Sequence, residues 1–134
     1  MTNALYAKGK EKLLSGSINM LTDTIKVALV KNTYGVNLAT HEFLSDLGAT
    51  TLGTNQTLTS KSVTGGVFDA ADPAWTAVAA GDTALAVVIF KDTGVAGTSP
   101  LLLYIDQITG FPLSTNGGNI SPEWDNGTFR IFSL

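Results

Sequence analysis

The stretch TALAVVIFKDTGVAGTSPLLLYIDQIT, Thr83–Thr109, decides the fold of this chain. Its two apolar runs, Ala84–Phe90 and Leu101–Ile108, have the length of buried strands and are rich in Val, Ile, Leu, Phe or Tyr. The connection between them, Asp92–Ser99, is polar and glycine-containing. This pattern predicts an antiparallel hairpin at the centre of a sheet. We expect its two strands to be the most buried of the fold and its connection to be an exposed loop.

The composition favours one β-rich domain, residues 1–134. Only 14% of the residues are charged, against about 25% in a typical soluble domain. Thr, Ser, Asn and Gly replace the missing charges, as is typical of β-rich proteins with uncharged turns. A surface with so few charges also suits a protein that neighbouring subunits partly cover.

Several classes of function are disfavoured by the same composition. The net charge is −3, and the single arginine stands in no basic cluster, so we expect no nucleic-acid partner. No apolar run approaches the ~20 residues that cross a bilayer, and the start MTNALYAKGKEKLL lacks the apolar core of a signal peptide. The chain has no cysteine, which excludes disulfides, thiolate chemistry and cysteine zinc sites.

Two helices are expected outside the hairpin. The pattern over Asn3–Leu14 predicts an N-terminal helix, with Thr2 or Asn3 as N-cap and Gly16 at the C-terminal cap. This helix either covers one face or end of the sheet or serves as an arm that docks on a partner. A second, short helix is expected over Thr40–Leu47, with Thr40 as its cap.

The rest of the chain predicts strands. Thr24–Lys31 alternates strictly, with Ile25, Val27 and Leu29 on one side. Two late strands, Ile120–Trp124 and Thr128–Leu134, are expected to form a hairpin around the turn Asn126-Gly127. The whole pattern predicts a mainly β chain of about seven or eight antiparallel strands, arranged as a β-sandwich or jelly-roll-like barrel with the two helices.

Asp92-Thr93-Gly94 is the one tripeptide that resembles a catalytic motif. It follows an apolar strand, as does each half-site of an aspartic protease, and a single copy would need a symmetric dimer to pair two carboxylates. Lys91 stands where an apolar residue is expected, and the following residues differ from the usual continuation. The sequence therefore favours a turn, with a dimeric aspartic protease as a remote alternative.

Other polar residues give no combination for catalysis. Asp69, Asp72 and Asp82 lie close in sequence, but their spacing matches no calcium-binding loop. His41 is the only histidine, which is a poor basis for a metal site or a catalytic triad. We therefore expect no catalytic residues, no metal and no cofactor, and leave open whether the three aspartates hold a cation.

Apolar residues in turns are the candidates for contact with a partner, because exposed aromatic and aliphatic side chains often carry interfaces. The alternative is that they fold back on the end of the sandwich and plug its core. The candidate residues are Tyr34, Val36, Phe111, Pro112 and Leu113.

The order of several segments resembles a known group of proteins. These segments are LLSGSINMLTDTIKVALV (13–30), THEFLSDL (40–47), GGVFDAADPAWTAV (65–78), VVIFKDTG (87–94) and NGGNISPEWDNGTFRIF (116–132). They resemble small virion structural proteins of tailed bacteriophages, of the capsid decoration (cement) type. The resemblance runs over nearly the whole chain and rests on turns and strands, with no catalytic signature.

This resemblance implies a non-enzymatic structural protein that is made in the bacterial host cytoplasm and placed on the capsid surface of the virion. Its partners would be the major capsid protein and further copies of itself, as a homo-oligomer such as a dimer or trimer. The alternative within the virion is a tail, neck or head-fibre component with a host- or glycan-binding role.

Overall fold

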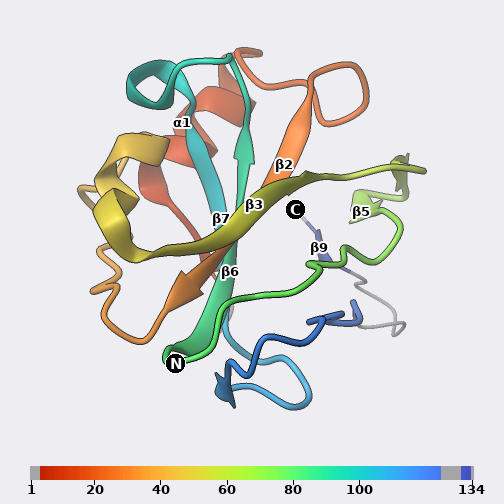
Figure 1. Ribbon diagram of the computed structural model, residues 1–134. Coiled ribbons are helices and arrows are strands. Elements are labelled where there is room, and N and C mark those ends of the chain that lie inside the picture. Colours follow the sequence, from red (N-terminus) through yellow and green to blue (C-terminus); the bar gives the residue numbers. More distant parts are fainter. Residues whose placement is uncertain (1–3, 125–130, 134) are drawn as a thin grey trace.

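The computed structural model describes residues 4–124 and 131–133, which form two antiparallel sheets (Figure 1). The main sheet has the strand order β1-β7-β6-β2-β3, with β8 paired to β6, and the smaller sheet has the order β4-β5-β9. The strands are Ala4–Leu5 (β1), Ile25–Lys31 (β2), Thr51–Thr57 (β3), Ser62–Thr64 (β4), Val67–Asp69 (β5), Thr83–Lys91 (β6), Leu101–Ile105 (β7), Leu113–Ser114 (β8) and Phe132–Ser133 (β9).

The central hairpin is formed by β6 and β7, as the sequence predicts. The two strands pair antiparallel, with Val88 opposite Tyr104, and β2 pairs with the other side of β6. All five residues of β7 are buried. The connection is exposed from Thr93 to Thr98, but Ser99 is completely buried, because its hydroxyl joins hydrogen bonds that close the loop.

The main sheet is covered on both faces, which explains the nearly continuous apolar runs of its central strands. Val27 and Leu29 of β2 face a large core that includes Phe68 and Trp75. Ala28 and Val30 face a second core, which contains Tyr34, Leu47 and Tyr104.

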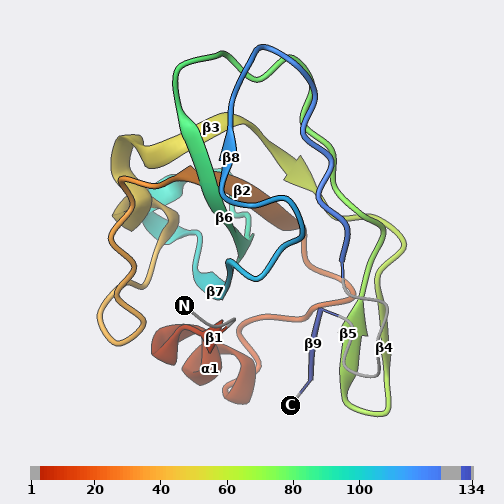
Figure 2. The same cartoon turned by 90° about the horizontal axis from the view of Figure 1, so that it is seen from below.

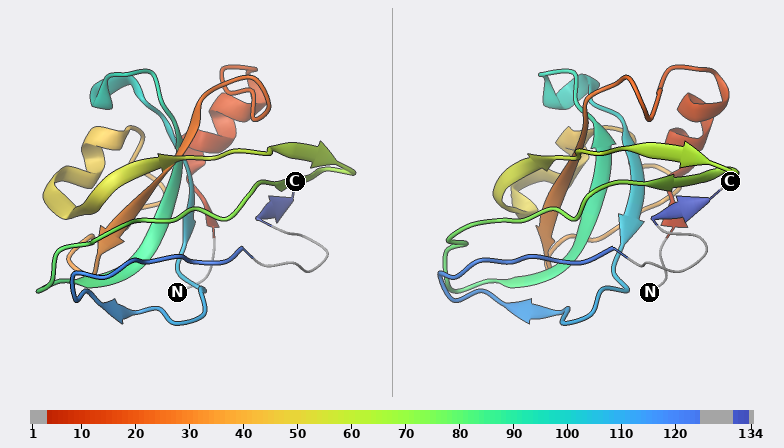
Figure 3. Two further views of the ribbon diagram at one scale, coloured as in Figure 1. Left: turned by 45° about the vertical axis from the view of Figure 1, so that its right-hand side comes forward. Right: turned by 90° about the vertical axis from the view of Figure 1, so that its right-hand side faces the viewer.

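The smaller sheet lies to one side of the main sheet (Figure 3). Phe68 of β5 and Phe132 of β9 stack there in a tilted pair, with ring centroids 5.6 Å apart. Phe68 also belongs to the large core, so the core joins the two sheets. The chain is therefore mainly β and sandwich-like, which confirms the predicted fold class.

The N-terminal helix begins later than the sequence predicts. Helix α1 spans Ala7–Leu14 with Tyr6 at its N-cap position, while Ala4–Leu5 forms β1 on the edge of β7 (Figure 2). The predicted caps, Thr2 and Asn3, lie outside the described residues. The physical reason for the later start is Tyr6, which is completely buried and whose backbone N–H donates to the carbonyl of Leu102. This anchoring holds the residues before it in an extended conformation.

The short helix is also displaced. A 3₁₀ helix, η1, spans Leu44–Thr50, with a kink at Gly48, and Thr40 does not cap it. Phe43 occupies the N-cap position, and the carboxylate of Asp46 in the first turn accepts hydrogen bonds from the backbone N–H groups of Glu42 and Phe43. A further short 3₁₀ helix, η2, spans Ala96–Thr98 in the central connection.

The segment Ile120–Trp124 is not a regular strand. Ile120 makes a single bridge to Trp75, and Pro122, which has no backbone N–H, cannot continue a ladder. The predicted turn Asn126-Gly127 and the start of the last strand lie outside the described residues.

Candidate functional site

A shallow pocket lies at one end of the main sheet and contains two of the predicted contact residues. It has a volume of about 130 Å³. Phe111 is partly buried and packs against the large core, Pro112 is exposed, and Leu113 is 36% exposed. We call this pocket the end pocket. Its lining includes Thr109, Phe111, Leu113, Ile120, Ser121 and Pro122.

Hydrogen bonds to a distant part of the chain hold the end pocket in place. The backbone N–H and the hydroxyl of Thr115 donate to the Asp82 carbonyl at 2.8 and 3.1 Å, and the same hydroxyl oxygen accepts from the Asp82 backbone N–H at 3.0 Å. Ile120 exchanges two 2.8 Å backbone hydrogen bonds with Trp75. The pocket is therefore a fixed feature of the fold, since both of its walls are tied to the segment before β6.

Tyr34 and Val36 lie on the other face of the main sheet from Phe111. Tyr34 is only 5% exposed and Val36 is partly buried, so both belong to the second core. The prediction that Tyr34 is exposed as an interface anchor is wrong in the isolated chain. The alternative describes Tyr34 correctly, since its side chain folds back and fills the core. The structure thus divides the predicted contact residues between two faces.

The burial of Tyr34 depends on a short chain of hydrogen bonds. Its hydroxyl lies 2.8 Å from the Tyr6 hydroxyl and 2.8 Å from Nδ1 of His41, whose ring stacks on it. Burial raises the pKa of Tyr6 and of Tyr34, and it raises the pKa of Tyr104 to about 12. These phenols are neutral structural groups at ordinary pH.

The opposite end of the molecule presents exposed apolar side chains. Leu21 is 50% exposed in the loop before β2, and Val95 is 60% exposed in the connection between β6 and β7. Both loops lie at the end of the main sheet that is uppermost in Figure 1. We call these two side chains the loop rim. Leu14, which is 87% exposed, ends helix α1 nearby in the chain.

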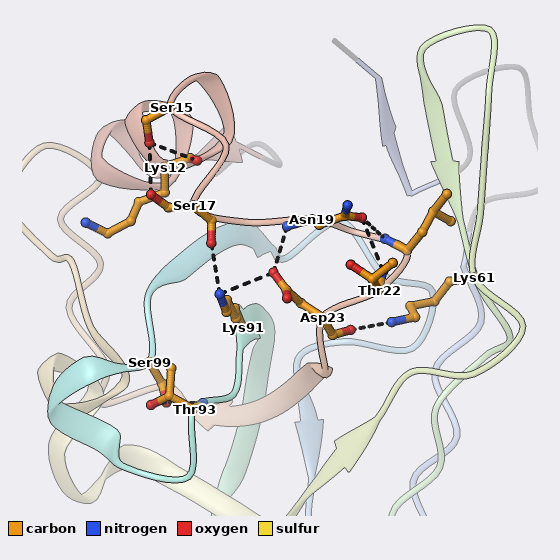
Figure 4. Close-up of polar contacts among 11 residues, drawn as sticks. Lys12, Ser15, Ser17, Asn19, Thr22, Asp23, Lys61, Lys91, Thr93 and Ser99 are labelled. Atoms are coloured by element: carbon orange, nitrogen blue, oxygen red, sulfur yellow. Dashed lines mark hydrogen bonds and ion pairs between the residues drawn. The ribbon is translucent and has the colours of Figure 1, made fainter.

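A polar network fixes the loop that carries Leu21 (Figure 4). The Asp23 carboxylate accepts a 2.7 Å hydrogen bond from the backbone of Asn19 and lies 3.3 Å from the Lys91 ammonium, which also donates to the carbonyl of Ser17. Lys61 donates to the backbone carbonyl of Asp23. The hydrogen bond from Asn19, aided by Lys91, lowers the pKa of Asp23. The loop is therefore ordered by its own contacts.

The second loop of the rim is an ordered turn. The carboxylate of Asp92 accepts a 3.0 Å hydrogen bond from the backbone of Gly94 and pairs with Lys26 at 3.1 Å. Both contacts lower the pKa of Asp92. An Asp carboxylate that accepts from the backbone N–H two residues later is typical of a turn. This agrees with the interpretation favoured by the sequence.

Two of the three aspartates of the possible cation site, Asp72 and Asp82, have separate partners elsewhere in the fold. Asp72 accepts a hydrogen bond from the backbone of Trp124, and Asp82 lies 3.5 Å from the Lys31 ammonium. Among residues 4–124 and 131–133, no three His, Asp or Glu side chains gather in a way that could hold a metal ion.

The sequence predicts that the connection carrying Val95 is exposed, and the structure confirms this, whereas the sequence gives no prediction for the exposure of Leu21. Val95 stands among small and polar residues in a turn, whereas Leu21 directly follows Met20 in a short apolar stretch, so nothing in the local sequence marks the Leu21 side chain as exposed.

Comparison with protein-family models and with curated proteins finds no match. Within the described part of the chain, no helix is long and apolar enough to cross a membrane.

Proposed function

We propose that this chain is a structural protein of a tailed-phage virion, a capsid decoration (cement) protein that binds the assembled head and stabilises it. Its main partner is the major capsid protein, and it works as a homo-oligomer on the capsid surface after synthesis in the bacterial cytoplasm. The resemblance of the sequence to this group supports the proposal. The loop rim is the structural observation that carries it.

The loop rim has the properties of a docking surface. Leu21 and Val95 stand on loops that their own hydrogen bonds already order, so binding loses little conformational entropy. The nearby charges are paired within the chain, Lys91 with Asp23 and Lys26 with Asp92. An apolar surface with its neighbouring charges neutralised fits an uncharged, apolar patch on the partner.

Stabilisation of a capsid follows from such a contact by mass action. A protein that binds the assembled shell and not its separated subunits shifts the equilibrium toward the shell. Many copies on one particle add their effects, so each contact can be modest.

The test is a binding titration of purified protein on expanded phage capsids that lack it. The double variant Leu21→Ser/Val95→Ser is expected to bind at least tenfold more weakly than the unaltered protein. Val63→Ser is the matched control, because Val63 is 47% exposed on β4, outside the loop rim. Equal binding of the double variant, or saturable binding to isolated tails in place of heads, would contradict the proposal.

A further inference from the structure

Helix α1 ends in an exposed leucine, and the end pocket has the volume to receive a side chain of that size. Leu14 is the most exposed large apolar side chain recorded among the described residues, at 87%. The end pocket, at about 130 Å³, is close in size to the apolar cavity of about 150 Å³ that accepts a benzene-sized group. It therefore has room for one branched aliphatic side chain.

The charges beside the two features are opposite. Lys10 stands one turn before Leu14, on the same face of α1. Lys8 and Lys12 pair with Glu11 and Glu42, whereas no ion pair of Lys10 occurs within residues 4–124 and 131–133. The helix thus offers a free ammonium next to an exposed leucine.

An exposed carboxylate follows the pocket lining in the sequence. Glu123 directly follows Pro122 of the pocket lining and is exposed, with no ion pair to another described residue. From Asp92 to Trp124 the sequence contains no Lys or Arg. A lysine of another molecule that approaches Glu123 would therefore not compete with a cationic side chain of that segment for the Glu123 carboxylate.

One chain cannot bring the two features together. The C-terminal end of α1 and the segment that forms the end pocket lie toward opposite ends of the molecule (Figure 3). A second copy carries the matching partner for each, so the occupant that fits the pocket is α1 of another molecule.

We propose that this protein self-associates through a head-to-tail contact, in which Leu14 of one copy enters the end pocket of the next and Lys10 faces Glu123. Because the two surfaces differ, the contact is heterologous. It repeats from copy to copy as a closed ring or an open chain. The proposal does not rest on the capsid role, since it concerns the free protein and uses neither Leu21 nor Val95.

The first experiment measures solution mass by light scattering over a concentration series. The unaltered protein is expected to exceed the 14.0 kDa of one chain, and Leu14→Ser is expected to weaken its association at least tenfold. Leu21→Ser is the matched control and should associate normally. A monomer at every concentration, or an oligomer that Leu14→Ser leaves unchanged, would overturn the proposal.

A charge exchange tests the predicted partners. Lys10→Glu and Glu123→Lys should each weaken the association, and the double variant should restore it, because the opposite charges face each other again. Both residues are exposed, so folding should be unaffected, and circular dichroism checks this. Additive losses in the double variant would contradict the pairing of Lys10 with Glu123.

A mixing experiment distinguishes a heterologous contact from a symmetric one. Ser121→Trp fills the pocket and keeps an intact Leu14, whereas Leu14→Ser keeps an intact pocket. Each variant alone should be monomeric, and their mixture should form a dimer with one copy of each. Failure to form this mixed dimer, with both variants folded, would overturn the head-to-tail arrangement.

Discussion

The Lys91 ammonium lies 3.3 Å from the Asp23 carboxylate and joins the end of β6 to the loop before β2. Both side chains are about three-quarters buried, with exposed fractions of 26% and 25%. This pair links the two loops of the proposed docking surface, because Lys91 directly precedes the connection that carries Val95. The order of the loop rim therefore depends on residues that do not belong to it.

Asp23→Asn is expected to destabilise the protein by about 1 kcal/mol at pH 7, which is the upper range for a partly exposed ion pair. The folded-state pKa of Asp23 is lowered. The Asp23 carboxylate therefore contributes its full stabilisation at a pH above its unfolded-state pKa of about 3.9. This stabilisation is lost as the pH falls through the lower folded-state pKa. Urea unfolding at pH 7 and below pH 4 checks this, and a difference from the unaltered protein that persists undiminished in acid would contradict it.

Gly9→Ala is expected to destabilise the protein although it improves helix propensity. A Cβ at position 9 would lie 2.7 Å from the carbonyl oxygen of Leu101 and 2.9 Å from Cα of Leu102. Relieving a backbone clash of this kind costs about 1–3 kcal/mol, against a propensity gain of up to ~1 kcal/mol. Thermal unfolding measures the net effect.

Gly97→Ala is the control for that change, because nothing lies within 4 Å of a Cβ there. It should alter stability by less than about 0.5 kcal/mol. A Gly9→Ala variant at least as stable as the unaltered protein would show that α1 does not pack against β7 as closely as described.

Tyr34→Phe removes the hydroxyl that lies between Tyr6 and His41. The Tyr6 hydroxyl is then left buried without its partner, which costs about 1–3 kcal/mol. Tyr104→Phe is the control, because it removes a hydroxyl from the same core. The Tyr104 hydroxyl makes no hydrogen bond to another residue within the described ranges. Chemical denaturation should show the larger loss for Tyr34→Phe, and equal losses would contradict the structural role of the hydrogen-bonded chain.

Replacements of Asp92 test the turn. Asp92→Asn keeps an oxygen that can accept from the Gly94 backbone and loses only the ion pair with Lys26, so it should cost about 0.5 kcal/mol. Asp92→Ala loses both contacts and should cost about 1–2 kcal/mol. Unfolding free energies should follow this order. Cleavage of a peptide library by the unaltered protein, abolished by Asp92→Asn, would instead support the protease alternative.

The central hairpin could be predicted because its strands are buried on both faces and their apolar runs end at clear turn residues. The helix start could not be predicted from local signals. Tertiary burial of Tyr6 holds the preceding residues extended, and this overrides the capping preference of Thr2 and Asn3. The short 3₁₀ helix likewise starts later than Thr40, because the carboxylate of Asp46 in its first turn accepts from the backbone of Phe43 at the N-cap position.

The candidate surfaces were only partly predictable. Phe111 and Leu113 stand in a strong turn signal, and both line the end pocket. Tyr34 has the same type of local sequence, yet its partner Tyr6 lies 28 residues away, so its burial depends on a contact that no local pattern reveals. The exposure of Val95 follows from the predicted exposed connection, whereas the exposure of Leu21 depends on which turns the fold leaves uncovered.

The most direct test of the capsid proposal is a cryo-electron microscopy reconstruction of expanded capsids that lack this protein, after incubation with an excess of it. We expect saturable, symmetric density on the outer surface of the shell, with the loops that carry Leu21 and Val95 against the major capsid protein. Capsids without added density at saturating concentration, or density placed only on the tail or neck, would contradict the account.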